Sequence, residues 1–545
     1  MTIFLIVSNC TSREASHESS QPNVLLIMID DLNDYEGSYG GHPQARTPNI
    51  DKLAASASVF TNAHTNSPVC SPSRNSMFTG IYPHTSKDFG WTFHAKQAVL
   101  QDTKTFIELF NENGYQTLGS GKIMHKNVRD YWDEWGVPER INYGPHAFDG
   151  KQIVGHPSVP EPFRGINIVD GSFSRLSDIP AFNIDGQGLR NTGWTYDGNE
   201  VYKYVNDNDR DLMPDEMHAD WAVKKIKEME NLSRDTPFFL GVGFVNPHTP
   251  LYAPDKYFDM FPLDEIQLSE IKEGDNEDVY YSSVYPPSEM GLHYFQALKS
   301  SYPIGDEGLR RVVQAYLACI AFVDDQVGKV MDALNNSEFS ENTIVILVSD
   351  HGWQFGEKDY LYKNSPWEES TRIPCIIRAP GITNAGSKVD HPVSLIDIYP
   401  TLVDMCHLKG STKKKETAPD IEGYSLLPFL EDRPEDWEGP DGALTVLGAG
   451  INTPIEGIGI STNKNALWHI EIITDLDDSC ILDQNYSYRT RGWRYIRYRN
   501  GMEELYDHTE DPYEWNNLAL EEKYFNKKIE LRQKVLGMIG KKDLE

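Results

Sequence analysis

The sequence predicts an α/β protein with a central sheet covered by helices on both faces, followed by a smaller α+β unit. Three continuous apolar runs, rather than alternating ones, are typical of strands buried on both faces, as in parallel sheets. These runs are "NVLLIMIDD" (23–31), "TPFFLGVGFVNPH" (236–248) and "NTIVILVSDHGW" (342–353). Helical patterns lie between them, and strands that alternate with helices indicate a doubly wound sheet.

The predicted helices follow from apolar spacing and from their end signals. "TPNIDKLAASASVF" (47–60) opens with Thr-Pro and has apolar residues three and four apart, which predicts a helix. "TKTFIELFNENGYQTLGSGK" (103–122) predicts a helix that ends at Gly114, then a short strand and a loop. "GLRRVVQAYLACIAFVDDQVGKVMDAL" (308–334) predicts a long amphipathic helix before the third strand. Residues 130–213 show no clear period, so we expect long loops over the strand ends.

The amino-acid composition of the chain changes after about residue 410. "STKKKETAPD" (411–420) and "EDRPEDWEGPDG" (431–442) are charged stretches with Pro and Gly, and one of them should mark a boundary. Beyond them, residues 489–507 predict two strands around an Asn500-Gly501 turn, and residues 521–539 predict a final helix. We expect an export segment with linker (1–22), a main domain (23–415) and a C-terminal α+β subdomain (416–545).

Composition excludes several classes of protein. The chain of 545 residues carries 82 acidic and 50 basic residues, a formal net charge of -32. Phosphate binding is driven by basic surfaces, so we expect no nucleic-acid partner, and an anionic substrate would need a local cationic pocket. The cysteines form no CxxC pair and predict neither a disulfide scaffold nor a zinc site, although one or two bridges remain open. They are Cys10, Cys70, Cys319, Cys375, Cys406 and Cys480.

The amino-terminal run "MTIFLIVSNC" is apolar but too short to span a bilayer. We interpret it as the end of an export signal, with Cys10 as a candidate for a lipid-bearing first mature residue. Asn9 is unusual before such a cysteine, and no Lys or Arg precedes it. We therefore expect an exported protein, periplasmic or at the cell surface, and keep the lipid anchor as a less favoured alternative.

Polar residues end the predicted strands. Ligands of a doubly wound sheet bind at the carboxyl ends of its strands, so these residues should converge on one edge: Asp30, Asp31, Lys122, His248, Asp350 and His351. Adjacent buried carboxylates repel each other, and a divalent cation is the usual way to stabilise them. Oxygen ligands favour calcium or magnesium, whereas an imidazole is a softer ligand. The alternative is that the Asp30-Asp31 pair only caps the next turn; the presence of two pairs favours a metal.

The segment "CSPSRNSMFTG" (70–80) resembles the signature of the sulfatase family, Cys-x-Pro-Ser-Arg followed by Thr-Gly. Phe78 stands where that family commonly has leucine, which is a mild departure. Further blocks resemble the family in the same order, namely "NVLLIMIDD", "TPNIDKLA", "GYQTLGSGKIMH", "FFLGVGFVNPHTP", "SDHGWQFGE" and "EELYDHTEDPYEWNNLA". The resemblance covers roughly residues 23–525. "GKIMH", "NPHTP" and the histidine after Asp350 look most like the branch that contains iduronate-2-sulfatase.

This resemblance implies an alkaline-phosphatase-like α/β/α sandwich, a calcium ion, and a formylglycine that a maturation enzyme makes from Cys70. A hydrated aldehyde supplies one hydroxyl that attacks sulfur, giving a covalent sulfo-enzyme, and a second that expels the product. A bare thiol would be a poor nucleophile for a sulfate ester. The calcium ligands that the resemblance implies are Asp30, Asp31, Cys70 as formylglycine, Asp350 and His351.

The resemblance also implies roles for the remaining site residues. Arg74 would stabilise the formylglycine and the metal site through its fork of donors. Four further residues would surround the sulfate, where positive charge and donors meet developing negative charge: Lys122, His125, His248 and Lys363. His248 would protonate the leaving alcohol with help from Lys363, and His125 would take the proton of the remaining hydroxyl. His64 and Trp353 are weaker candidates for contact with substrate.

Each of these residues also has a simpler interpretation. Lys122 and His125 follow a Gly-rich turn and would then be solvated. His248 lies between two prolines and would bond only to the backbone, and Lys363 would pack its stem against the neighbouring aromatic rings. The order of the motifs along the chain favours the catalytic interpretation.

We therefore expect a calcium-dependent sulfatase acting on a sulfated oligosaccharide or polysaccharide, such as a 2-O-sulfated uronate of ulvan or a glycosaminoglycan. The first rival is a phosphate or phosphonate ester hydrolase of the same superfamily. The second is an inactive, metal-holding carbohydrate-binding protein in which Cys70 stays a thiol.

Overall fold

A computed structural model describes residues 21–90, 93–183, 189–191, 193–231, 236–285, 289–448 and 478–541. Residues 1–20, with Cys10 and the predicted export signal, lie outside the described residues, so both expectations stay predictions. Among the helices of the described ranges, none combines the length and apolar character needed to cross a bilayer.

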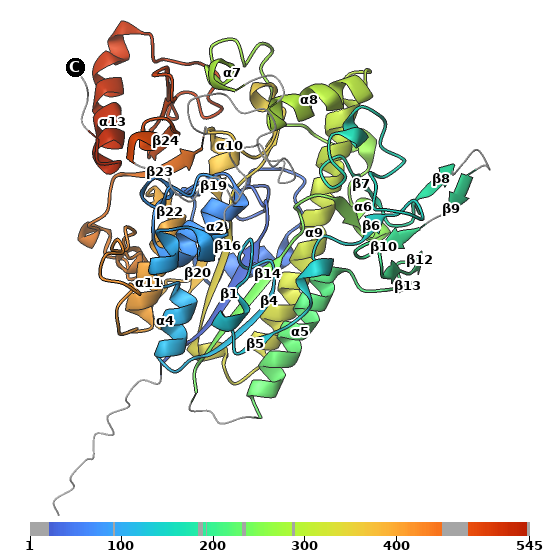
Figure 1. Ribbon diagram of the computed structural model, residues 1–545, viewed down its shortest axis with the longest axis horizontal. Coiled ribbons are helices and arrows are strands. Elements are labelled where there is room, and N and C mark those ends of the chain that lie inside the picture. Colours follow the sequence, from blue (N-terminus) through green and yellow to red (C-terminus); the bar gives the residue numbers. More distant parts are fainter. Residues whose placement is uncertain are drawn as a thin grey trace, which may run out of the picture.

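A sheet of eight strands forms the centre of the molecule (Figure 1). Its strands, in spatial order, are β21 (Ser387–Val389), β2 (Ser58–Phe60), β20 (Cys375–Arg378), β16 (Thr343–Ser349), β1 (Asn23–Ile29), β14 (Phe238–Phe244), β4 (Gln116–Gly121) and β5 (Glu134–Trp135). The three predicted strands are β1, β14 and β16, and β1 pairs in parallel with both of the others. β20 runs antiparallel to β16 and β2, so the sheet is mixed rather than wholly parallel.

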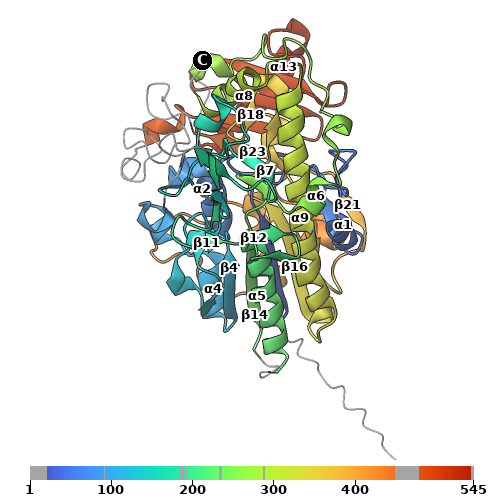
Figure 2. The same ribbon diagram turned by 90° about the vertical axis from the view of Figure 1, so that its right-hand side faces the viewer.

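Both faces of the sheet are buried, as the continuous apolar runs predicted. Along β1, Leu25, Ile27 and Ile29 pack into one hydrophobic cluster, and the alternate residues pack into a second cluster on the other face. The first face is covered by α1 (Pro48–Ala54), α5 (Pro214–Met229) and α9 (Glu307–Asn335). The second is covered by α2 (Cys70–Thr79), α4 (Phe106–Glu112) and α11 (Ile398–Met405). Figure 2 shows α5 and α9 side by side along one face.

The helix predicted within residues 103–122 forms as α4 and ends just before Gly114, as expected. Thr105 caps α4 by accepting from the backbone N–H of Glu108, whose carboxylate accepts from the Thr105 N–H in return. Gly114 follows the helix with φ 80°, a left-handed conformation that glycine adopts without steric cost. The chain then enters β4 at Gln116, which places Lys122 directly after the strand.

Residues 130–213 contain short strands in small sheets, where the sequence analysis expected long loops. These strands are β6 (His146–Ala147), β7 (Phe173–Arg175), β8 (Ala181–Asn183), β9 (Leu189–Asn191), β10 (Trp194–Thr195), β11 (Val201–Tyr202), β12 (Tyr204–Asn206) and β13 (Asp209–Arg210). Pairs of two or three residues leave no periodic signal in a sequence. β7 pairs with β15 (Leu251–Ala253), three residues after His248, so this segment does lie beside the carboxyl end of β14.

A second sheet lies at the top of Figure 1, with α13 (Phe525–Met538) against it. Its four antiparallel strands are β23 (Gly442–Leu447), β24 (Asn485–Thr490), β25 (Trp493–Arg497) and β26 (Glu503–Asp507). The predicted turn at Asn500-Gly501 joins β25 to β26, and Gly501 has φ 82°. The boundary between residues 415 and 416 stays a prediction.

A buried ion-pair network joins this second sheet to the main domain. The guanidinium of Arg494 pairs with Glu368 and Glu514, and it donates to the Pro366 carbonyl at 3.1 Å. Arg489 also pairs with Glu368, at 3.0 Å. Oxygen and nitrogen atoms of Glu368, His508 and Glu514 lie close enough to hold an ion, but the two arginines already balance the carboxylates.

Replacing Arg494 with alanine is expected to destabilise the fold by about 3–5 kcal/mol, because the buried Glu514 would lose its arginine and Glu368 would lose one of its two. The midpoint of thermal unfolding measures this effect. Arg433→Ala is the matched control: Arg433 is half exposed and pairs with carboxylates at the surface, so its loss should leave the midpoint unchanged. Equal midpoints for the two variants would contradict the structural role of Arg494.

Candidate active site

The polar residues at the strand ends converge on one edge of the sheet, as predicted. β16, β1, β14 and β4 are consecutive and parallel, so their carboxyl ends lie together. Asp30 and Asp31 directly follow β1, and Asp350 and His351 directly follow β16. His248 lies four residues after β14. All of these side chains are buried.

Cys70 is the first residue of α2 and points into this group. One side-chain atom each of Asp31, Cys70, Asp350 and His351 lies within 4.8 Å of the others. The Cys70 Sγ is 3.2 Å from the His351 Nε2 and 3.8 Å from the Asp31 Oδ1. The start of α2, which bears the cysteine, therefore meets both acidic pairs, although Cys70 and Asp350 are 280 positions apart in the sequence.

Arg74 lies one helical turn after Cys70, on the same face of α2. Its guanidinium donates to Asp30 at 2.7 Å and to Asp350 at 2.9 Å. It also donates to the backbone carbonyls of Ile123, at 2.8 Å, and Lys122. One fork of donors thus ties the ends of β1, β4 and β16 together.

Two lysines approach the cysteine from different elements. Lys363, directly after β18 (Leu361–Tyr362), lies 3.1 Å from the Cys70 Sγ and 2.9 Å and 3.0 Å from the two oxygens of Asp31. Lys122 lies 3.7 Å from the same sulfur and pairs with Asp30. These carboxylates raise the pKa of both lysines against the effect of burial, so both stay positively charged.

Hydrogen bonds to carbonyl groups define the protonation of the two site histidines. The Nδ1 of His351 bonds to the Gly352 carbonyl at 3.1 Å, and the Nδ1 of His248 bonds to the Thr249 carbonyl at 2.6 Å. A carbonyl only accepts, so the proton is on Nδ1 and the Nε2 lone pair is free to accept. The Nε2 of His248 faces Asp31 at 3.8 Å, and that of His351 faces it at 3.3 Å.

The three aspartates differ in how well their charge is compensated. Burial raises the pKa of Asp31 well above its usual value, although Lys363 and His351 act in the opposite direction. For Asp30 and Asp350 burial also acts upward, but Lys122 and Arg74 outweigh it at Asp30, and Arg74 and His351 at Asp350. Their pKa values therefore lie below the usual range. Of the three aspartates, Asp31 is the one whose negative charge the protein's own cations stabilise least. A divalent cation bound beside it would supply the missing stabilisation.

The three remaining candidates, His125, His64 and Trp353, differ in their surroundings. Burial, followed by Lys122 and Arg74, lowers the pKa of His125 well below its usual value, which links this residue to the same charge cluster. His64 is buried and bonds to Asn62 at 2.7 Å, while Trp353 is buried with its ring 4.3 Å from that of Tyr362. The structure therefore places His64 and Trp353 in side-chain packing.

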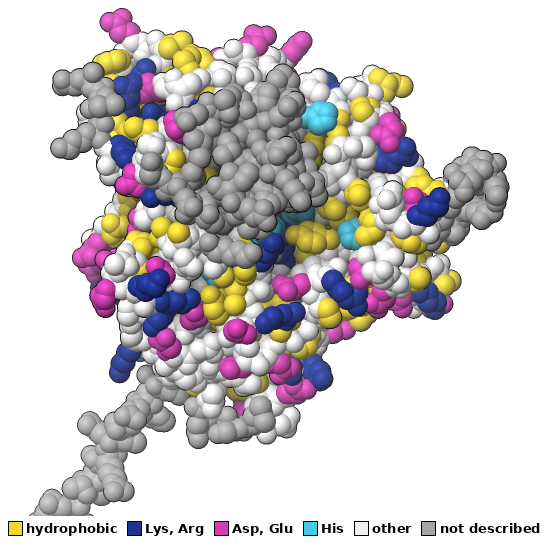
Figure 3. Space-filling model, viewed as in Figure 1, with side chains coloured by type: hydrophobic (Ala, Val, Ile, Leu, Met, Phe, Trp, Pro, Cys, Tyr) yellow, Lys and Arg dark blue, Asp and Glu magenta, His cyan; other side chains and the backbone are white. Residues whose placement is uncertain are grey.

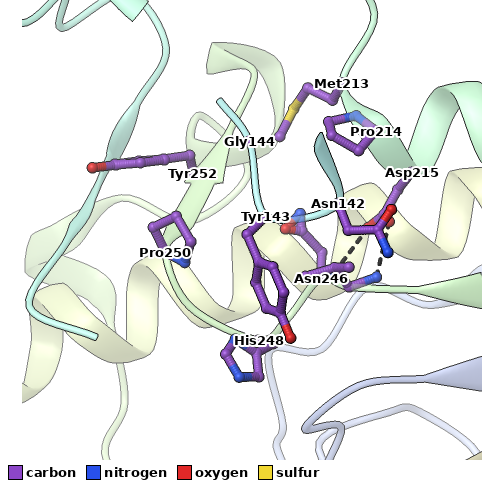
Figure 4. A pocket seen from close by; sticks show the side chains of 11 residues that line it. Asn142, Tyr143, Gly144, Met213, Pro214, Asp215, Asn246, His248, Pro250 and Tyr252 are labelled. Carbon is purple, nitrogen blue, oxygen red and sulfur yellow. Dashed lines mark hydrogen bonds between the residues drawn. The ribbon is translucent and has the colours of Figure 1, made fainter. Parts of the chain in front are cut away.

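A small pocket adjoins His248, and sequence reasoning predicted none of its other lining residues, of which Tyr143 lies against His248. It is lined by Asn142, Tyr143, Gly144, Met213, Pro214, Asp215, Val245, Asn246, His248, Pro250 and Tyr252. In Figure 4 the Tyr143 ring extends toward His248; the ring centroids are 5.2 Å apart, and Lys122 lies 5.2 Å from the same ring. Tyr143 belongs to residues 130–213, and no motif marks it. In Figure 3, dark blue and cyan side chains lie in a hollow near the centre of the face.

A buried cysteine, three carboxylates, three cationic side chains and histidine acceptor nitrogens lie together at one edge of the α/β sheet. This combination indicates a hydrolase that acts on anionic esters. The chain belongs to the sulfatase family, because the sulfatase family model matches residues 22–408. It is a sulfuric ester hydrolase.

Curated relatives agree with this assignment. A sulfatase of Formosa agariphila is 31% identical over 530 residues, covering 96% of this chain and 88% of that protein. Iduronate 2-sulfatase of Mus musculus is 28% identical over 451 residues, covering 74% of this chain and 73% of that protein. An ulvan-active sulfatase of Formosa agariphila is 26% identical over 517 residues, covering 93% and 78%.

Solved structures confirm the alkaline-phosphatase-like fold. A phosphonate monoester hydrolase of Agrobacterium radiobacter superposes with a TM-score of 0.66 at 21% identity, covering 95% of both chains. A 2-O GAG sulfatase superposes with a TM-score of 0.62 at 20% identity, covering 95% of this chain and 92% of that one.

Proposed function

We propose that this protein hydrolyses sulfate esters on a carbohydrate, with calcium bound at the strand ends and a formylglycine made from Cys70. The observation that carries the proposal is the meeting of Cys70 with both acidic pairs and two lysines within one buried cluster. The sulfatase family provides the reaction class.

The donor set fits a hard divalent cation. Asp30, Asp31 and Asp350 offer carboxylate oxygens, which calcium and magnesium prefer, and His351 offers an imidazole nitrogen as the softer ligand. The hydrogen bond from the His351 Nδ1 to a backbone carbonyl keeps its Nε2 free to bind a metal. Bound there, the cation would polarise a sulfate oxygen and the group made from Cys70.

The environment of Cys70 disfavours the thiol itself as the nucleophile. Burial raises the pKa of its thiol, although Lys122 and Lys363 act against this effect. A thiol that stays protonated is a weak nucleophile. The formylglycine supplies, as a hydrate, one hydroxyl for attack on sulfur and one for product release. A maturation enzyme would carry out this conversion. We also propose that the protein is exported, either to the periplasm or to the cell surface.

The surrounding residues would bind the sulfate group and move protons. Lys122 and Lys363 keep their charge and are placed to bind sulfate oxygens beside Cys70. Burial and these two lysines lower the pKa of His248 well below its usual value, so Lys363 is the protonated group before an anion enters. A bound anionic ester would favour protonation of His248, and the two residues would then share proton delivery to the leaving oxygen. His125 would accept a proton as sulfate leaves.

The names of two relatives support a carbohydrate substrate. The relatives include an iduronate 2-sulfatase and an ulvan-active sulfatase. A 2-O-sulfated uronate of a sulfated polysaccharide is therefore the substrate that we propose, and the short sheets of residues 130–213 beside His248 would form part of its pocket.

Assays of the matured protein on defined sulfated oligosaccharides test this proposal, with nitrophenyl sulfate and nitrophenyl phosphate as comparison esters. We expect release of inorganic sulfate from a 2-O-sulfated uronate and faster turnover of the sulfate than of the phosphate aryl ester. Preferred hydrolysis of phosphate or phosphonate esters would overturn the assignment of substrate. Binding of the oligosaccharide without any release of sulfate would favour the inactive binding protein.

A further inference from the structure

Asp170 is a buried carboxylate in residues 130–213 and accepts hydrogen bonds from three hydroxyl groups. The Thr249 Oγ1 donates to its Oδ1 at 2.6 Å, the Tyr362 hydroxyl donates to the same oxygen at 3.2 Å, and the Tyr294 hydroxyl donates to Oδ2 at 2.8 Å. Asp170 lies on a turn before β7, about 80 residues from Thr249 and 190 from Tyr362.

Two of these donors are sequence neighbours of the proposed proton donors. Thr249 follows His248, and its carbonyl holds the His248 ring through Nδ1 at 2.6 Å. Tyr362 precedes Lys363, whose ammonium lies against Cys70 and Asp31. One carboxylate oxygen therefore connects the segment that carries His248 to the segment that carries Lys363.

The segment around Lys363 needs such support, because its backbone is strained. Tyr362 has φ 100° and Asn364 has φ 77°, conformations that residues with a side chain rarely adopt. Hydrogen bonds hold the backbone at Lys363 and directly after it: the Tyr360 hydroxyl donates to the Lys363 carbonyl at 2.9 Å, and the Tyr281 hydroxyl donates to the Asn364 carbonyl at 3.0 Å. The bond from Tyr362 to Asp170 is the contact that ties this segment to the His248 side.

The direction of these bonds is unambiguous. Burial, followed by the charge of Asp170 itself, raises the pKa of the Tyr362 and Tyr294 hydroxyls well above the usual value. Both phenols therefore stay protonated and donate, and a carboxylate accepts all three bonds. An asparagine at this position could place its single carbonyl oxygen where Oδ1 lies and keep the bonds from Thr249 and Tyr362, whereas an alanine loses all three.

We propose that Asp170 is a positioning residue that holds His248 and Lys363 in fixed relation to each other on the two sides of Asp31. The inference rests on the proposed function, because proton delivery to a leaving oxygen is what gives this arrangement its use. Asp170 touches neither Cys70 nor the acidic pairs in the described hydrogen bonds, so it acts through the two segments.

The test compares two sulfate esters that differ in their need for a proton. A sugar alcohol is a poor leaving group that needs protonation, whereas nitrophenolate leaves without it. In Asp170→Ala, which removes all three bonds, we expect kcat to fall about 100-fold on the sulfated sugar, the size typical of lost proton transfer, and less than about 3-fold on nitrophenyl sulfate. KM should stay within about 3-fold, because Lys122 keeps its place beside Cys70 and still binds the sulfate group.

Single-bond variants separate the two connections. Thr249→Val removes the bond on the His248 side and Tyr362→Phe removes the bond on the Lys363 side, and each should show the same selective loss at smaller size. Asp178→Ala is the matched control. The Asp178 carboxylate lies in the same segment and, among the described residues, accepts a side-chain hydrogen bond from Ser174 alone, so its loss should leave both activities unchanged. Equal losses on the two esters, or no loss in Asp170→Ala, would overturn the proposal.

Crystal structures of the wild type and of Asp170→Ala provide a readout without turnover. We expect the variant to show Lys363 displaced from Asp31, or the Lys363 segment displaced from the His248 segment. Unchanged positions of both side chains would overturn the positioning role. A wild type that releases no sulfate from either ester would instead refute the proposed function, and the crystallographic comparison would still decide the role of Asp170.

Discussion

Cys70→Ala is expected to release no measurable sulfate, with a loss of at least about 10,000-fold, the order seen when a hydrolase loses its nucleophile. The alanine has no atom from which an aldehyde can be made, while the lysines, Arg74 and the acidic pairs keep their partners. Release of inorganic sulfate from the preferred oligosaccharide, followed over time with protein from a host that has the maturation enzyme, measures the effect.

The matched control is Cys406→Ala. Cys406 is also fully buried, but it lies beyond the end of α11 in the cluster on the second face of the sheet. This variant should keep its activity, with at most a small loss of stability from the missing sulfur. Comparable activity of the two variants would show that Cys70 is a packing residue and not the reactive group.

Asp350→Asn is expected to lower activity by about 1,000-fold or more and to weaken retention of the divalent cation. Asp350 accepts from Arg74 at 2.9 Å and from the backbone N–H of Asp31 and of His351, both at 3.1 Å. An asparagine keeps the shape but removes a negative charge, and its amide nitrogen cannot accept from Arg74 or bind a cation. The cation content of the purified protein, measured by atomic emission, provides a readout independent of activity.

Asp420→Asn controls for loss of one negative charge. The Asp420 side chain is 88% exposed and pairs with Lys413 at the surface, so its replacement should change neither cation content nor activity. Chelation followed by stepwise return of calcium should restore the wild type at lower calcium concentrations than Asp350→Asn. Identical cation content and calcium dependence in the two proteins would contradict the assignment of Asp350 as a ligand.

The core of the fold was predictable because its signals are local. β1, β14 and β16 are continuous apolar runs, and Gly114 ends its helix at the expected place. The antiparallel course of β20 was not predictable, since four residues between turns carry no mark of direction. The strands of residues 130–213 were missed for a related reason: their pairings extend over two or three residues and give no period.

The same distinction between local and long-range signals applies to the site residues. Asp30, Asp31, Asp350, His351 and Arg74 lie in motifs of adjacent residues, and the structure brings all of them together with Cys70. Tyr143 and Asp170 belong to segments without a motif and reach the site through contacts over long stretches of chain. Strained φ angles at Tyr362 and Asn364 are likewise visible only once the backbone is known. Such residues can be identified only from their neighbours in the folded structure.

The central claim is that Cys70, enclosed by the acidic pairs and two lysines, is converted to formylglycine. Mass spectrometry of the peptide that carries Cys70, isolated from protein made in the native organism, tests it directly. The account predicts a residue that has lost sulfur and two hydrogens and gained an oxygen relative to cysteine. A peptide with the mass of unmodified cysteine, from protein that nevertheless releases sulfate, would contradict it.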